Sequence, residues 1–245
     1  MNAPAILTAR VLSRNRVDLI FAAVAPLLGL VGLTFLLRGV IDTGEMSYAQ
    51  YVLPAVVVQA MLFGALTTTD RAAQEKASGL GTRLRTLPIS QYSSLIARMT
   101  YCLIRAAVAI AASLLAALVF GFTFDTGIGY AAAFLALSLL LTLALSLGAD
   151  ATGTKAGRTE VASQLLMVPQ LLLVLLSTGV APLESFPKWL QPAVQYQPIS
   201  QITETLRGFT SGHVSTANLL TSLAWCVGLL IVFGWITLRL QRRTK

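Results

Sequence analysis

The sequence predicts an all-α integral membrane protein with six transmembrane helices. Its 245 residues are 56% hydrophobic and only 11% charged, whereas soluble domains carry about 25% charged residues. Six apolar runs are each about 20 residues long, the length that crosses a hydrocarbon core as a helix. The runs lie at 17–37, 51–69, 100–122, 128–147, 161–180 and 217–238. We expect one membrane-embedded domain over residues 1–245.

The stretch before the first run is basic and only weakly amphipathic. It contains Arg10, Arg14 and Arg16. Two interpretations stay open: a helix along the inner membrane surface with its arginines toward lipid phosphates, or a frayed basic tail. The first run is too long for a signal peptide and lacks a clear small-residue cleavage site, so we expect it to remain as an anchor.

Lysine and arginine are unevenly distributed around the runs. Fourteen lie at the two termini and in the second-to-third and fourth-to-fifth connections, three lie on the opposite side, and Arg105 lies inside the third run. The positive-inside rule therefore predicts that both termini are cytoplasmic. A net charge of +8 could also indicate nucleic acid. The charges flank apolar runs, however, so membrane lipids are the expected partners and nucleic acid is not.

The connection at 70–90 is a polar, basic island between the second and third runs. Glu75, Lys76 and Arg83 have helical spacing, and Pro88 disfavours helix in the residue before it. The segment therefore predicts a short cytoplasmic helix that docks to a soluble partner. The alternative is an ordinary positive-inside loop that contacts lipid.

The segment at 182–212, on the predicted outer side, is interrupted by prolines yet keeps apolar and aromatic residues. Pro187 and Pro198 exclude one continuous helix, whereas Phe186 and Trp189 are typical of a membrane interface. We expect two short helices that dip back into the outer leaflet. The alternative is a solvated loop with scattered aromatic residues.

Four residues interrupt otherwise apolar runs. They are Gln59 in the second run, and Gln164, Pro169 and Gln170 in the fifth. Polar groups in hydrocarbon need partners, so these side chains should face other helices or a cavity. Interhelical hydrogen bonding would satisfy them equally well. Arg105 lies only a few residues inside the third run, so we expect it to snorkel toward the inner headgroups.

No catalytic or metal-binding constellation is visible in the sequence. His213 is the only histidine, and Cys102 and Cys226 fall inside predicted spans as small apolar fillers. The nearest match to a phosphate loop, at 148–155, has lysine in the wrong place and follows a span instead of a strand. We therefore expect no catalytic residue, no metal site and no cofactor bound by this chain.

Two stretches resemble a known family. They are QEKASGLGTRLRTLPIS at 74–90, and the FPKWLQP, QPIS and LRG blocks within 177–212. Together with the hydropathy pattern they resemble the type-2 ABC transporter permease family, in its daunorubicin-resistance-like branch of drug and lipid exporters. The resemblance covers nearly the whole chain.

This resemblance implies a function in a bacterial inner membrane. The chain would be the permease subunit of an ATP-driven exporter for a drug, lipid or glycolipid. It would pair with a second permease, identical or paralogous, and rest on an ABC ATPase subunit that carries ATP and Mg. The chain itself would not be an enzyme.

The resemblance also implies roles for particular residues. The 70–90 connection would be the coupling helix, and the elements of 182–212 would gate the outer exit. Spans two and five would line the translocation pathway. The coupling residues would be Glu75, Gly79, Arg83, Arg85 and Pro88; the pathway residues Gln59, Gln164, Pro169 and Gln170; and the gate residues Phe186, Pro187, Trp189 and Pro198.

Two other function classes stay as alternatives. An ion-coupled secondary transporter is disfavoured because the acidic residues, among them Asp18 and Asp150, flank the predicted spans, whereas proton relays place carboxylates within the membrane. A membrane-embedded lipid-modifying enzyme is disfavoured because no catalytic cluster is present.

Overall fold

The computed structural model describes residues 3–37, 48–79, 90, 92–122, 127–156, 159–179 and 183–243, and its regular elements there are all helical. They are α1 (Ala3–Arg14), α2 (Arg16–Leu37), α3 (Tyr48–Ala77), α5 (Ser93–Val119), α6 (Ile128–Ala156), α7 (Thr159–Leu175), η1 (Leu183–Ser185), α8 (Gln191–Tyr196), α9 (Pro198–Ser211) and α10 (Thr216–Arg243). The all-helical fold class is thereby confirmed.

Five of these helices are long and apolar enough to cross a membrane: α2, α3, α5, α6 and α10. The fifth predicted span, at 161–180, corresponds to α7, whose apolar part covers only Ala162–Leu175. The 17 residues of α7 extend about 26 Å at 1.5 Å per residue, slightly less than a hydrocarbon core of about 30 Å. The six-span count therefore stays a prediction.

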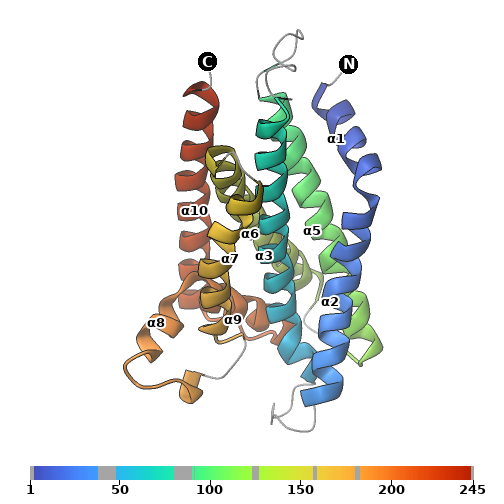
Figure 1. The fold of residues 1–245 in the computed structure, drawn as a ribbon. Helices are drawn as coiled ribbons and strands as arrows, with labels where there is room; N and C mark the ends of the chain where they lie inside the picture. The colour runs from blue at the N-terminus through green and yellow to red at the C-terminus, as the bar shows by residue number, and fades with distance from the viewer. Residues whose placement is uncertain are drawn as a thin grey trace.

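The long helices lie side by side, and α9 lies across one end of the bundle (Figure 1). Both termini lie at the opposite end, which we call the terminal face. Helix α3 is central, because it packs against α2, α5, α6, α7 and α9. The core around it consists largely of Val, Ala and Leu side chains from α3, α5, α6 and α9.

Glycine permits close approach at two places on α6. A Cβ at Gly153 would overlap the backbone carbonyl oxygen of Thr69 on α3. A Cβ at Gly148 would lie 2.8 Å from a ring carbon of Phe233 on α10. Since real Cβ atoms do not approach so closely, these two positions bring α6 into contact with both neighbours.

The basic N-terminal stretch is a helix, so the frayed-tail interpretation is wrong. Helix α1 packs against α5 and is separated from α2 by Asn15 alone. The amide of Asn15 donates a 2.8 Å hydrogen bond to the carbonyl of Val11. The Asn15 side-chain amide therefore donates to a backbone carbonyl in the last turn of α1, as is typical of a helix end.

The proline-rich segment forms packed elements, so the solvated-loop alternative is also wrong. Proline stands in the first turn of both α8 and α9, where its missing N–H costs nothing. Helix α9 buries one face, with Ile202 and Leu206 fully inaccessible, and packs against α3, α6 and α10. It ends at Gly212, whose φ of 78° is the left-handed conformation that glycine favours.

Candidate functional site

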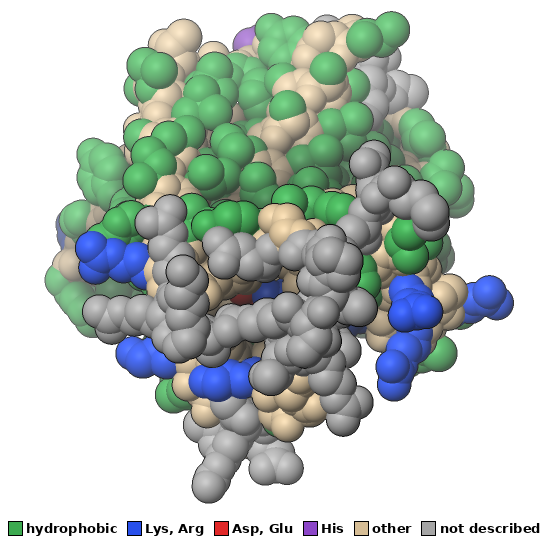
Figure 2. Space-filling view, turned by 90° about the horizontal axis from the view of Figure 1, so that it is seen from above, with side chains coloured by type: hydrophobic (Ala, Val, Ile, Leu, Met, Phe, Trp, Pro, Cys, Tyr) green, Lys and Arg blue, Asp and Glu red, His purple; other side chains and the backbone are tan. Residues whose placement is uncertain are grey.

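The terminal face carries the positive charge of the molecule. Figure 2 shows Lys and Arg side chains gathered on this end, beside largely apolar helix sides. Two buried clusters of charged side chains lie just beneath it. They tie α3 to its neighbours, and we describe each in turn.

The first cluster joins α3, α5 and α6 through Arg98, and we call it the Arg98 triad. Arg98 of α5 forms ion pairs with Glu75 in the last turn of α3 and with Asp150 of α6, the second at 2.7 Å. Ser94 also donates a 3.4 Å hydrogen bond to Glu75. Asp150 is only 1% exposed. Arginine keeps its charge in proteins, so both carboxylates lie beside a fixed positive charge.

A further contact supports the triad at the same end of α3. The ammonium of Lys76 donates a 2.6 Å hydrogen bond to the carbonyl of Thr154 in α6. The last turn of α3 is therefore bonded to α5 and α6 by adjacent residues. A displacement of this turn would have to break these bonds or carry the neighbouring helices with it.

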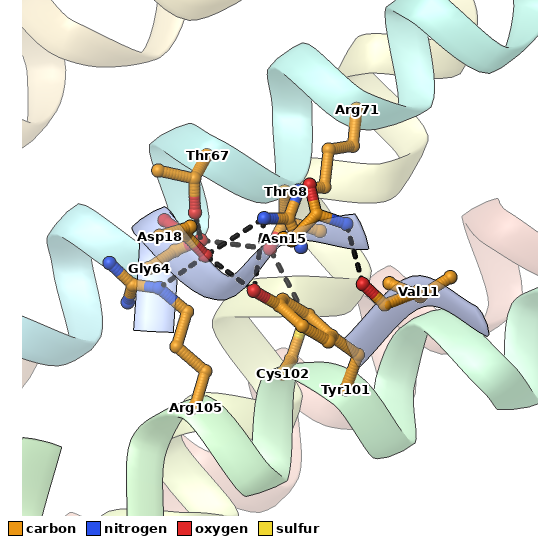
Figure 3. Close-up of polar contacts among 10 residues, drawn as sticks. All are labelled: Val11, Asn15, Asp18, Gly64, Thr67, Thr68, Arg71, Tyr101, Cys102 and Arg105. Atoms are coloured by element: carbon orange, nitrogen blue, oxygen red, sulfur yellow. Dashed lines mark hydrogen bonds and ion pairs between the residues drawn. The ribbon is translucent and has the colours of Figure 1, made fainter. Parts of the chain in front are cut away.

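The second cluster centres on Asp18 of α2, and we call it the Asp18 cluster (Figure 3). Its carboxylate pairs with Arg71 of α3 at 2.8 Å and with Arg105 of α5 at 3.2 Å. The hydroxyl of Tyr101 donates to the same oxygen at 2.6 Å. Arg71 also stacks on the ring of Tyr101, 4.1 Å from its centroid. One aspartate thus binds three side chains from two helices.

A glycine makes the Asp18 cluster sterically feasible. A Cβ at Gly64 of α3 would lie 2.8 Å from a terminal guanidinium nitrogen of Arg105. Arg105 is 8% exposed and pairs with Asp18 inside the protein. Its snorkelling toward the inner headgroups stays a prediction.

A groove of about 560 Å³ opens between α2 and α3 beside the Asp18 cluster. Its polar end is formed by Arg14, Asn15, Asp18, Thr67 and Arg105. The remainder is apolar apart from Gln59, with side chains such as Phe21, Pro26 and Val56. The groove is therefore amphipathic along its length.

At the opposite end, α8 and α9 are attached to the bundle by polar contacts. Gln197 donates to the carbonyl of Leu176 at the end of α7, and the Ser200 hydroxyl accepts a 3.1 Å bond from the Thr178 backbone. The guanidinium of Arg207 lies 4.0 Å from the ring centroid of Tyr51. Burial lowers the pKa of Arg207.

Comparison with known proteins identifies the family to which this chain belongs. The family model described as "ABC-2 family transporter protein" matches residues 32–239, most of the chain. The chain belongs to the ABC-2 family of transporter proteins. It is a membrane permease subunit of an ABC transporter, since the relatives that it matches over most of its length are permease proteins.

Three relatives of this ABC-2 permease are named as drug-resistance permeases. It is 28% identical over 225 residues to the probable doxorubicin resistance permease DrrC of Mycobacterium tuberculosis, covering 90% of this chain and 80% of that protein. It is 29% identical over 227 residues to the daunorubicin resistance permease DrrB1 of Streptomyces coeruleorubidus, covering 92% and 80%. The M. tuberculosis doxorubicin resistance permease DrrB is 29% identical over 191 residues, covering 76% and 66%.

The predicted coupling residues of the ABC-2 permease are only partly located. Glu75 lies in the last turn of α3, so the first part of the predicted coupling helix continues span two and is not a separate element. Gly79 follows with a φ of 65°, which ends the helix in a left-handed turn. Arg83, Arg85 and Pro88 lie outside the described residues.

The four predicted pathway residues occupy two places. Gln59 lines the groove between α2 and α3. Gln164 and Pro169 are exposed on α7, where Gln170 is half-buried. Helix α7 packs against α3 and α6, and its other face exposes large apolar side chains including Leu165, Val168, Leu171 and Leu172. The α7 residues therefore border a surface that is free in the single chain.

The predicted gate residues lie together around η1, α8 and the start of α9. Phe186 is half-buried, and its carbonyl accepts a 3.0 Å hydrogen bond from Gln191. Pro198 begins α9. Pro187 is exposed, and Trp189 is 79% exposed, so neither contributes to the core.

Sequence reasoning missed the two charged clusters of this permease. From the sequence, Arg98 and Asp150 are expected to lie outside the membrane spans. In the structure, α6 continues to Ala156, and the Asp150 side chain is buried against the neighbouring helices. Asp18 and Arg71 are 53 residues apart. Acidic residues and arginines do occur near the same ends of neighbouring apolar runs, which indicates that ion pairs can form there. This pattern does not specify which residues pair.

Proposed function

We propose that this permease is one half of the membrane part of an ATP-driven exporter in a bacterial inner membrane. Residues 1–245 form one permease domain with six spans, α7 being the fifth, and both termini are cytoplasmic. A second permease, identical or paralogous, completes the pathway. An ABC ATPase subunit binds ATP and Mg and docks on the terminal face.

The observation that carries this proposal is the attachment of α3 to its neighbours. Helix α3 runs without a break from Tyr48 to Ala77, and its last turn leads directly into the segment proposed to contact the ATPase. The Arg98 triad joins that turn to α5 and α6. Movement of the docked ATPase would therefore displace three membrane helices together, which is what coupling requires.

The basic side chains that follow Ala77 suit a docking role. Arg83 and Arg85 would make charge-assisted hydrogen bonds to carboxylates or carbonyls of the ATPase. Gly79, already in a left-handed turn, gives the chain its change of direction after α3. Pro88 would end the docking segment before α5 begins at Ser93.

The proposed pathway runs along α7 and its contact with the second permease. Gln164, Pro169 and Gln170 supply polar groups on an otherwise apolar helix, and Gln59 supplies one on α3. Proline at position 169 leaves a carbonyl of the preceding turn without its helical partner, and this carbonyl can accept a hydrogen bond. Such a sparsely polar surface suits a hydrophobic or amphipathic substrate.

The names of the relatives favour a drug as the substrate class over a lipid or glycolipid. The outer elements would close the exit. Phe186, Pro187 and Trp189 precede α8, and Pro198 fixes the start of α9, whose buried face rests on the core. Exposed Trp189 would sit at the level of the outer headgroups.

The proposal is tested by purification with and without an ABC ATPase subunit from the same organism. The isolated permease should show no ATPase activity above background, and the complex should hydrolyse ATP faster when substrate is added. Specific hydrolysis by the isolated chain would refute it. Transport that continues without ATP and follows a proton gradient would instead support an ion-coupled transporter.

A further inference from the structure

The polar end of the α2–α3 groove has more positive than negative charge. Arg71 and Arg105 share the single carboxylate of Asp18, and Arg14 lines the same end of the groove. Arg71 does not itself line the groove, but the Asp18 cluster and the groove end together contain three arginines and one aspartate. In Figure 3 the terminal nitrogens of Arg105 point away from Asp18. An anion in the groove would offset this excess of positive charge. The attraction is stronger inside a protein than in water, because the effective dielectric constant is lower.

The apolar part of the groove has the length of one lipid chain. Along α2 it extends from Phe21 to Leu33, about 18 Å at 1.5 Å per residue. One leaflet of a hydrocarbon core is about 15 Å thick, half of about 30 Å. Its volume of about 560 Å³ lies in the range of ligand pockets, about 300–1,000 Å³.

We propose that this groove binds one anionic phospholipid of the inner leaflet. Its phosphate contacts Arg14 and Arg105, and one acyl chain lies along α2 between Phe21 and Leu33. The inference goes beyond the proposed function, because the lipid is a resident ligand and not the exported substrate. Its acyl chain lies beside Gln59, so the lipid borders the proposed pathway. By binding α2, α3 and α5 at one point, it holds the Asp18 cluster in place.

Charge decides between an anionic lipid and other occupants. A cationic amphiphile would bring a fourth positive charge to a site with one aspartate, and like charges repel. A zwitterionic lipid would fill the apolar part but place its own cation near the arginines. A second copy of this chain would need an acidic segment to match, and α7, the exposed apolar helix, has no acidic side chain from Ala162 to Leu175.

The experiment is native mass spectrometry of the full chain loaded with equal amounts of phosphatidylglycerol and phosphatidylcholine. The wild type should retain one phosphatidylglycerol in preference to phosphatidylcholine. Arg14→Gln should lower that preference about fivefold, since one basic residue contributes about that factor to binding of an anionic lipid. Arg10→Gln, on the same helix but away from the groove, should leave the preference unchanged.

A second pair of variants tests the acyl-chain site without touching a charge. Gly29 lines the groove, and a Cβ there meets no atom within 4 Å, so the side chain of Gly29→Phe should enter the groove without a clash at its Cβ. It should abolish retention of the lipid. Gly32→Phe is the matched control, because Gly32 is equally open but does not line the groove.

Four results would overturn the proposal. Equal retention of the two lipids would mean a non-selective apolar filler. Unchanged retention in Gly29→Phe would place the lipid elsewhere. Displacement of the lipid by inorganic phosphate alone would mean an anion site without a chain. Cysteine at Phe21 should also fail to cross-link two copies, and efficient cross-linking would show that a second permease covers the groove.

Discussion

Replacing Arg98 by glutamine is the substitution expected to damage this permease most. In the structure, Arg98 pairs with two carboxylates of different exposure. Asp150 is 1% exposed and the Glu75 side chain is 25% exposed. Without the guanidinium, Asp150 is left charged and buried with no ionic partner. Breaking a buried pair from one side costs about 3–5 kcal/mol.

The assay is thermal unfolding of the purified chain in detergent. For a chain of this size, 1 kcal/mol corresponds to a change in Tm of about 2–4 °C. Arg98→Gln should therefore lower Tm by about 6–20 °C. Glu75→Gln removes only the more exposed partner and should cost about 0–1 kcal/mol, a change of no more than about 4 °C.

A double variant separates stability from coupling. Arg98→Met with Asp150→Leu replaces the buried pair by apolar side chains, an exchange that is often neutral or stabilising. It should restore Tm, yet it removes the ion pair between Glu75 and α5 and leaves only the longer hydrogen bond from Ser94. Substrate-stimulated ATPase turnover of the assembled transporter should therefore stay low.

Two outcomes would refute this reasoning. If Arg98→Gln melts within about 4 °C of the wild type, the triad does not carry a buried charge. If the double variant recovers both Tm and turnover, the triad stabilises the fold but does not couple ATP hydrolysis to transport.

Three further predictions follow from other parts of the chain. Arg83→Ala with Arg85→Ala should insert normally but weaken ATPase association by about 2–5 kcal/mol, measured by co-purification; wild-type recovery would leave both arginines as topology determinants only. Gly153→Ala places a methyl group against a carbonyl of α3 and should cost about 1–3 kcal/mol in thermal unfolding. Gly129→Ala in the same helix meets no atom within 4 Å and should melt at or above the wild-type temperature, so equal losses would contradict the packing argument. Cysteine at Gln164, in a cysteine-free background, should be labelled by a water-soluble thiol reagent and protected by substrate; labelling only by a lipid-soluble reagent would place it outside the pathway.

The helices of this protein could be predicted because length and apolarity alone specify a membrane span. Five of the six predicted runs correspond to helices long enough to cross a membrane, and the remaining run, at 161–180, corresponds to α7. The boundaries were less accurate at the terminal face. Helices α3 and α6 continue through Glu75 and Asp150, since buried ion pairs let polar turns stay helical inside the protein.

The site could be predicted only where local pattern was sufficient. Pro187 and Pro198 excluded one continuous helix over 182–212, and the separate short helices α8 and α9 confirm this break. The Asp18 cluster could not be predicted, because Asp18 and Arg105 are 87 residues apart and their pairing depends on how α2 packs on α5. Gly64 gave no signal in the sequence, and its role depends on the guanidinium that it accommodates.

The unbroken length of α3 has a mechanical consequence. The helix carries Glu75 near one end and Tyr51, which stacks on Arg207 of α9, near the other. Pro54 is the one proline within it and removes a backbone hydrogen bond close to Tyr51. If the ATPase docks beyond Ala77 as proposed, a displacement there would reach Pro54 along about 35 Å of continuous helix. It would then tilt α9 without any loop having to relay the signal.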